Sequence, residues 1–372
     1  MIWKYLKGRS KGMNNYLRKF ISVCGMFAAA TVFAGSNNNQ DSDSNNTDQR
    51  AGVPPGACQM GEDAMSVSIM AAYTLWTARE GGLCVASTNV WSGNTANPVQ
   101  GSKIYPATRL NSGFEVGLGA NLYHDCWDIQ ARYEWFRNNN STQSSATVAS
   151  GQAIATWPFY NATSVTPVYA QLNAVSSAWR LQFNRVDANM GRSFYAGHYL
   201  MLRPFIGLVG MWDTQHFDFT YQPGGTYNRV DYFYNKQTSW GVGPYAGTNT
   251  SYFITNDWSV FLNMGAALPW SQFQPTSQEH TVRTYTNATT YQTVTEYWTS
   301  DSQYYVEPMI EMMLGLAWDS MWSDNTWGLR IAAAWEEQIW FSHNHMQPPT
   351  MGSAGYGDLS LQGFTLTVTV SF

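Results

Sequence analysis

Charged residues, cysteines and long apolar runs are scarce in this sequence of 372 residues. Charged residues make up only 12%, about half the usual share, so the protein does not have the charged surface of a typical water-soluble protein. Four cysteines are too few for a disulfide scaffold. No run of about eighteen apolar residues occurs after residue 34, and this absence excludes a bundle of transmembrane helices.

The N-terminal segment has the composition of an export signal. Residues 1–19 carry six basic residues and no acidic one, and the apolar stretch FISVCGMFAAATVFA follows at 20–34. This pattern predicts a cleaved signal peptide over 1–34. Residues 35–64 are rich in Asn and Ser and then in Pro and Gly, which predicts an extended periplasmic leader. Without the signal peptide, fourteen basic residues face twenty-five acidic ones, a net charge of −11 that disfavours nucleic acid as a partner.

Aromatic residues are abundant at 15%, and many lie in segments that alternate apolar and polar residues. In the last segment, FTLTVTVSF, one face is Phe, Leu and Val while the other is Thr and Ser. Period-two alternation indicates a β-strand with one apolar face. Ten such segments occur within 65–372: 66–77, 113–122, 127–136, 179–184, 200–212, 240–252, 258–270, 306–318, 327–335 and 364–372.

The connections between these segments alternate in length. They are short after 122, 190, 252 and 318, and long and polar after 77, 136, 212, 270 and 341. Short turns at one end and long loops at the other are typical of an outer-membrane barrel. We therefore predict an all-β fold: a transmembrane antiparallel up-and-down β-barrel of about ten strands, with long extracellular loops. Twelve strands are the alternative if 217–221 and 227–235 form a further membrane hairpin.

Tryptophan marks both ends of three predicted strands, which predicts two aromatic girdles about 20–30 Å apart. The pairs are Trp127 with Trp135, Trp258 with Trp270, and Trp327 with Trp335. The last strand must pair with the first, because an open edge in hydrocarbon leaves backbone groups unsatisfied. The terminal Phe372, with apolar residues alternating back from it, resembles the assembly signal that barrel-assembly machinery reads.

Four long stretches resemble the pore-forming major outer membrane protein family of Legionella and of chlamydia-like bacteria. They are GFEVGLGANLYHDCWDIQARYEWF, NRVDANMGRSFYAGHYLMLRPFIGLVGMW, SYFITNDWSVFLNMGAALPWSQF, and LGLAWDSMWSDNTWGLRIAAAWEEQIWFSHN followed by GDLSLQGFTLTV. The resemblance implies a porin in the outer membrane through which small hydrophilic solutes diffuse. It implies no catalytic residues. A structural or adhesin-type barrel without an open pore is the alternative.

Charged residues that alternate with the apolar stripes are the candidate pore lining, because an outward Arg at the bilayer midplane costs about 2–4 kcal/mol. Six acids against four arginines predict a weak preference for cations, set chiefly by Glu307 and Glu311. The alternative is a plugged lumen in which the same residues form interior salt bridges. The candidates are Glu115, Asp128, Arg132, Glu134, Arg180, Arg203, Glu307, Glu311, Arg330 and Glu336.

Other candidate chemistry is weaker. His343 and His345 form an HxH pattern that we place in a solvated loop, and no further metal ligands are identified, so we expect neither a metal nor another cofactor. No His lies on a predicted strand near a partnered Ser, so we expect no enzyme activity. Cys58 and Cys126 should share the periplasmic side and could form a disulfide, with intermolecular bridges as the rival. Expected partners are outer-membrane lipid, barrel-assembly machinery and further copies of the chain.

Overall fold

The computed structural model describes thirteen segments of the chain: 67–88, 102–122, 127–138, 146–147, 153–157, 159–161, 164–168, 171–197, 199–223, 229–285, 291–322, 327–346 and 357–372. The predicted signal peptide and leader lie outside these segments. So do Cys58 and Cys126, and their pairing stays a prediction. Within the described segments, no helix has the length and apolar character needed to cross a membrane.

The described strands form one antiparallel ring. β1 (Val67–Glu80) pairs with β4 (Leu110–Asn121), and β4 pairs with β5 (Trp127–Asn138). β5 pairs with β10 (Gln171–Arg192), which is the next strand of the ring. From there the order is β12 (Leu200–Pro223), β13 (Arg229–Phe253), β14 (Trp258–Ala267) with β15 (Trp270–Tyr285), β16 (Tyr291–Val306) with β17 (Met309–Trp322), β18 (Trp327–Asn344) and β19 (Gly357–Ser371).

Two positions in the ring are filled by strands in two parts. β14 and β15 both pair with β13, and the break between them contains Pro269. β16 pairs with β15 and β17 pairs with β14, with Pro308 in the break. Proline has no N–H to donate to the ladder, so each break is a local interruption of one long strand. Counted in this way, the ring has about ten strands, as the sequence predicts.

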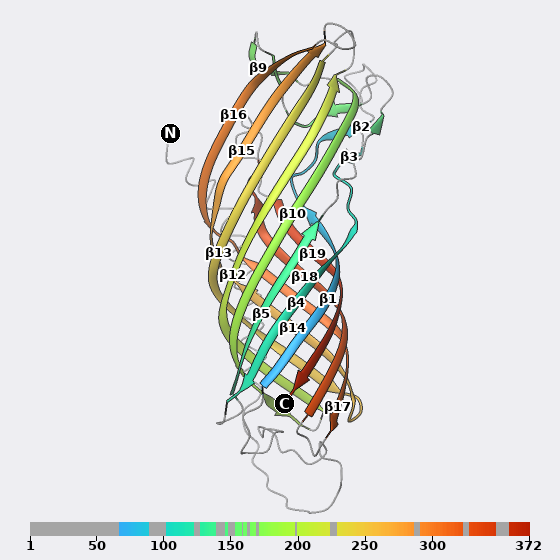
Figure 1. The fold of residues 1–372 in the computed structure, drawn as a ribbon, viewed down its shortest axis with the longest axis vertical. Helices are drawn as coiled ribbons and strands as arrows, with labels where there is room; N and C mark the ends of the chain where they lie inside the picture. Colours follow the sequence, from blue (N-terminus) through green and yellow to red (C-terminus); the bar gives the residue numbers. More distant parts are fainter. Residues whose placement is uncertain are drawn as a thin grey trace, which may run out of the picture.

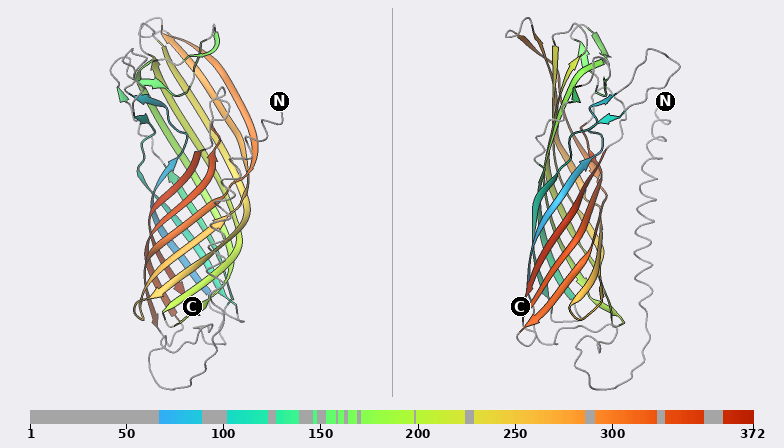
Figure 2. Two further views of the ribbon diagram at one scale, coloured as in Figure 1. Left: turned by 180° about the vertical axis from the view of Figure 1, so that it is seen from behind. Right: turned by 90° about the vertical axis from the view of Figure 1, so that its right-hand side faces the viewer.

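One side of the ring is much taller than the other (Figures 1 and 2). β12 and β13 contain 24 and 25 residues, whereas β4 and β5 contain 12 each. We call β10, β12, β13, β15 and β16 the tall wall. We call the end of the ring that holds Val67 and Phe372 the turn end. The opposite end is the tall end.

The tall wall corrects two expectations about loops. The sequence predicts long loops after 212 and 270, but these residues continue β12 and β15. Segments 217–221 and 227–235 do not add a hairpin to the ring. The first lies within β12, and the described part of the second, from Arg229, lies within β13. The physical reason is composition, because these segments are rich in Tyr, Phe, Thr and Val, which favour strands.

The two faces of the sheet follow the alternation in the sequence. Leu118, Ile206 and Leu208 point outward and are each more than 60% exposed, while their neighbours in sequence face the interior. Apolar side chains outside and polar ones inside are the arrangement of a barrel surrounded by lipid. Several small strands extend these ladders: β6 (Ala146–Thr147) and β7 (Ala153–Ala155) pair with β10, and β11 (Phe194–Ala196) pairs with β12. β2 (Ala86–Thr88) pairs with β3 (Lys103–Ile104) and with β7. β8 (Phe159–Asn161) and β9 (Ser164–Val168) form a separate two-stranded sheet.

The last strand closes the ring. β19 pairs with β1 from Ser371 opposite Ser68 to Leu359 opposite Glu80. Phe372 N donates to Val67 O over 2.9 Å, and Val67 N donates to Phe372 O over 2.8 Å. The Phe372 ring also packs against Trp327, with 5.5 Å between ring centroids. The pairing satisfies the backbone to the final residue, and the role of Phe372 in assembly stays a prediction.

The predicted girdle tryptophans lie on the outer face. Trp258, Trp270, Trp327 and Trp335 are each about half exposed, at 50%, 49%, 49% and 54%. Trp127 and Trp135 are partly exposed at opposite ends of β5. Side chains that are part apolar and part polar suit the boundary between lipid and water.

Candidate functional site inside the barrel

The lumen contains a cavity of about 320 Å³ on the turn-end side. Gly117 and Gly119 of β4 face inward and carry no side chain to fill it. The lining comes from all sides of the ring and combines apolar with polar side chains. It includes Ser68, Gln130, Asn249, Ser251, Asn263 and Thr369. A cavity with this lining suits water and small polar solutes.

An ion-pair layer closes the inner end of this cavity. Two arginines, Arg132 of β5 and Arg185 of β10, lie between two shared carboxylates. Arg132 Nε donates to Asp187 Oδ2 over 3.1 Å, and Arg185 Nη2 lies 3.3 Å from the same oxygen. Both guanidinium groups also contact Glu311 of β17, at 3.2 Å from Arg132 Nη2. Because β5 and β17 lie on opposite sides of the ring, these contacts cross the lumen.

The tyrosine of this layer depends on a glycine. Tyr245 of β13 donates its hydroxyl hydrogen bond to Glu311. Gly265 of β14 lies beneath both side chains. A Cβ at Gly265 would come within 2.7 Å of Tyr245 Cε2 and 2.8 Å of Glu311 Oε1. Glycine therefore permits the close approach of Tyr245 and Glu311.

Three further carboxyl groups share the layer. Glu115, Glu134 and Glu336 are all buried, and each has an oxygen within 4.8 Å of an oxygen of the others. Gln338 Nε2 donates to Glu134 over 2.7 Å and to Glu336 over 3.3 Å. Arg132 Nη1 lies 3.6 Å from Glu115 and 3.8 Å from Glu336. These oxygens could hold a metal ion by distance, but an amide and a guanidinium already occupy their surroundings.

The formal charge of the layer is negative. Its carboxyl groups are Glu115, Glu134, Asp187, Glu311 and Glu336, and its arginines are Arg132 and Arg185. Five carboxylates against two guanidinium groups leave an excess of three negative charges if all are ionised. Coulomb interactions are strengthened where water is excluded, so the ionisation of these carboxyl groups decides the charge that the layer presents to the cavity.

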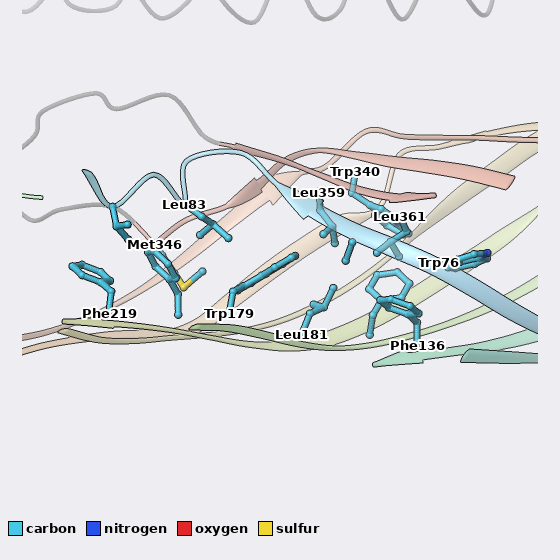
Figure 3. Close-up of a cluster of buried hydrophobic side chains, with 14 of the residues drawn as sticks. Trp76, Leu83, Phe136, Trp179, Leu181, Phe219, Trp340, Met346, Leu359 and Leu361 are labelled. Carbon is cyan, nitrogen blue, oxygen red and sulfur yellow. The ribbon is translucent and has the colours of Figure 1, made fainter. Parts of the chain in front are cut away.

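An aromatic layer lies on the tall side of the ion pairs. Trp76 of β1 packs against Phe136 of β5, with 5.8 Å between ring centroids. Phe183 of β10 packs edge-on against Trp340 of β18 at 5.5 Å. β10 and β18 are on opposite sides of the ring, so this contact spans the lumen. Figure 3 shows Trp76, Phe136 and Trp340 of this layer. The four side chains are fully buried. The aromatic layer therefore closes the lumen in this structure.

Beyond the aromatic layer lies a buried polar network. His343 Nδ1 is 2.5 Å from Glu307 Oε1, and His343 Nε2 is 3.4 Å from Asp213 Oδ2. Ser271 Oγ donates to Glu307 over 3.0 Å, and Ser239 Oγ donates to Asp213. The hydroxyl groups of Ser271 and Ser239 therefore donate their hydrogen bonds to the carboxylates and not to the imidazole of His343.

This network corrects the expectation that His343 and His345 lie in a solvated loop, because both are buried. The chain turns at Ser342, whose φ is 60°. Left-handed backbone is rare for a residue other than glycine. The turn carries 343–346 into the lumen, where His345 N donates to Gln237 Oε1 over 2.8 Å.

Apolar side chains fill the tall end. Trp157, Phe217 and Phe219 pack together, with Trp157 5.1 Å from Phe219 between ring centroids. Leu83 and Met346 join the same cluster from segments that follow β1 and β18 (Figure 3). The inner face of the tall wall is therefore covered by parts of the chain that fold inward.

Nine of the ten candidate lining residues face the interior. Those outside the ion-pair layer are also paired: Arg203 Nε donates to Asp128 over 2.7 and 2.9 Å, Arg330 Nη1 to Asp319 over 3.2 Å, and Glu307 contacts His343. These charges are buried and paired, as in the alternative of a plugged lumen whose charged residues form interior salt bridges. This holds for the part of the lumen that the ion-pair layer and the aromatic layer close. The cavity below it is lined by Glu115, Arg132, Arg203, Glu311, Arg330 and Glu336.

Arg180 is corrected. It is 50% exposed on the outer face and donates to Asp218 Oδ2 over 2.7 Å. Instead, Trp179, Leu181 and Phe183 face the lumen, and the pairing of β10 with β5 continues without a bulge from Leu181 to Arg192. The sequence predicts Arg180 inside because the apolar side chains of 179–184 alternate with it and have the composition of a lipid-facing stripe. Unbroken alternation from Trp179 would have placed Arg185 and Asp187 inside.

A closed antiparallel ring with an apolar outer face and a charged interior defines the class of an outer-membrane β-barrel protein. The model of the family described as "Legionella pneumophila major outer membrane protein precursor" matches residues 86–372. The chain belongs to this family, which confirms the resemblance found in the sequence.

Similar solved structures are distant. The outer membrane protease OmpT from Escherichia coli is 10% identical, with a TM-score of 0.34, and the match covers 82% of this chain and 96% of that one. Ail, the attachment invasion locus protein of Yersinia pestis, is 8% identical at a TM-score of 0.26, covering 82% and 98%. A major outer membrane protein from Thermus thermophilus is 7% identical at 0.26, covering 83% and 100%. None of the curated proteins is significantly similar.

Proposed function

We propose that the protein is a narrow, weakly cation-preferring channel that lets small ions and hydrophilic solutes diffuse across the outer membrane. We also propose that a cleaved signal peptide directs the protein to export. The observation that carries the proposal is the cavity at the turn end, into which polar side chains from all sides of the ring project and which leads to a charged layer with an excess of carboxyl groups. A lumen built only for mechanical support has no need of charge at its centre, where each buried ion is costly.

Passage requires the aromatic layer to move. Trp340 and Phe183 meet across the lumen, so conduction occurs in brief openings when these rings change rotamer and the ion-pair layer and the tall-end side chains move with them. A ring of about ten strands is narrow, and openings of this kind exclude large sugars. Arginines oppose the carboxylates on the same wall, and salt screens charges beyond about 8–10 Å. The preference for cations is therefore weak.

The proposal excludes catalysis. Two serines of the described lumen share the carboxylate partners of His343, because Ser239 donates to Asp213 and Ser271 donates to Glu307. A serine nucleophile needs its hydroxyl directed at the base. The site is also fully buried, so substrate has no access to it.

Liposome swelling with solutes of increasing size tests the proposal. We expect permeation by salts and small amino acids and a sharp cut-off before disaccharides. The matched control is the same liposome preparation with heat-unfolded protein.

The second candidate is a structural or adhesin-type barrel without an open pore. The complete burial of Trp76, Phe136 and Trp340 favours it. Absence of swelling with every solute, together with absence of ion current, would support this candidate against the channel.

A further inference from the structure

Basic side chains collect on the outer face of the tall wall and of the neighbouring strand β5. Arg180 of β10 lies directly opposite His216 of β12, and His216 lies directly opposite Lys236 of β13. Directly opposed residues have Cβ atoms about 4.5–5.5 Å apart, so the three side chains form one short row. Arg137 of β5 lies in the adjacent row, opposite Gln182. Arg137, Arg180 and Lys236 are exposed, and His216 is partly exposed.

An aromatic row on the same face marks the lipid boundary. Pairing places Trp135 opposite Asn184, Asn184 opposite Trp212, and Trp212 opposite Trp240. Trp240 Nε1 donates to Gln272 Oε1 over 3.0 Å. Tryptophan is enriched at the interface between hydrocarbon and headgroups.

The basic row lies beyond this boundary, toward the tall end. His216 is four residues from Trp212 along β12, and Lys236 is four residues from Trp240 along β13. At about 3.3 Å per residue and a tilt of roughly 40°, the basic row is about 10 Å beyond the aromatic row. This is the height of the charged headgroups of the adjacent leaflet.

The local charge contrasts with that of the chain. Without residues 1–34 the sequence carries −11, yet in the described parts of β5, β10, β12 and β13 the one acidic side chain on the outer face is Asp218. It accepts a hydrogen bond from Arg180. Three basic groups against one carboxylate leave +2 with His216 neutral. Positive charge at this height is not needed to hold the strands, which are paired through their backbones.

We propose that Arg137, Arg180, His216 and Lys236 bind the phosphate groups of anionic outer-leaflet lipid. Arginine and lysine donate charge-assisted hydrogen bonds to phosphate oxygens. Each Lys or Arg near an anionic membrane surface strengthens attraction about fivefold. The site requires the tall end to face outside and is independent of whether the lumen conducts.

The test uses the full-length protein folded in detergent micelles and titrated with bisphosphorylated lipid A, with the same lipid after phosphate removal as the comparison probe. Native mass spectrometry counts retained lipid. The combined variant Arg137→Gln, Arg180→Gln and Lys236→Gln should weaken binding about 100-fold, since three charges at about fivefold each are removed. The control Arg192→Gln, which lies on the outer face of β10 near the turn end, should bind as the wild type does.

A second variant separates binding from damage to the fold. Asp218→Asn removes the acidic group and releases Arg180, so affinity for bisphosphorylated lipid A should rise about fivefold. A misfolded barrel cannot produce this gain. The proposal is overturned if Asp218→Asn leaves affinity unchanged or lowers it, if the triple variant binds like the wild type, or if removing the phosphates from the lipid makes no difference.

Discussion

Replacement of Glu311 by Gln tests the ion-pair layer most severely. Glu311 accepts from Arg132, Arg185 and Tyr245, and these three side chains come from strands on other sides of the ring. Glutamine has nearly the same shape but removes the charge. Arg185 is fully buried and then keeps, among the described residues, Asp187 and, at 3.9 Å, Glu134 as charged partners.

The expected loss is large because the remaining charge has no route to water. Removal of one partner of a buried ion pair costs about 3–5 kcal/mol, mostly from the charge left behind. We expect the Glu311→Gln variant to lie in the lower half of this range, since Asp187 still neutralises part of Arg185. A matched surface-side change is Asp319→Asn, whose partner Arg330 is 31% exposed. Pairs with this much solvent contact contribute about 0–1 kcal/mol.

Urea unfolding in lipid vesicles measures both variants, with tryptophan fluorescence as the signal. A second combination, Arg185→Met with Glu311→Met, removes both charges and should recover most of the lost stability. A loss below about 1 kcal/mol for Glu311→Gln, or equal losses for Glu311→Gln and Asp319→Asn, would refute the assigned ion-pair layer.

Three further outcomes are expected. Glu115→Gln with Glu336→Gln reduces the formal excess of negative charge from three to one, so the reversal potential in a salt gradient should move toward anions; an unchanged potential counts against this layer as the selectivity filter. Burial raises the pKa of the Cys84 thiol above its usual value, so alkylation at pH 8 should be slower than for a free thiol and should accelerate as the pH rises; a rate equal to that of free cysteine contradicts the assigned burial. With the tall end outside, a membrane-impermeant maleimide should label Thr284→Cys on intact cells but not Ser193→Cys, and the reverse pattern inverts the orientation.

The ring could be predicted because lipid imposes a strict pattern. Outward positions in hydrocarbon are apolar, so apolar residues at every second position, such as Leu118 and Leu208, identify the strands and their lipid-facing side. The same constraint separates strands from turns and yields the approximate strand number. Family resemblance gave the same fold, since its motifs are strand and turn sequences.

The interior could not be predicted to the same extent. Alternation shows which residues share a face but not which face is inside, and the lumen at the tall end is apolar. Trp179, Leu181 and Phe183 therefore look like a lipid-facing stripe although they line the lumen. The inward path of 343–346 depends on one backbone turn at Ser342, for which the sequence provides no glycine or asparagine as a signal.

Single-channel recording in planar bilayers tests whether the narrow lumen conducts when its aromatic layer moves. The wild type should show small, brief openings. Trp340→Ala removes the ring that meets Phe183 across the lumen and should give larger and longer openings, whereas Trp335→Ala on the outer face should leave the current unchanged. The folded state of each protein is checked by its heat-sensitive mobility on a gel. Absence of current from both the folded wild type and folded Trp340→Ala would show that the lumen is not a channel.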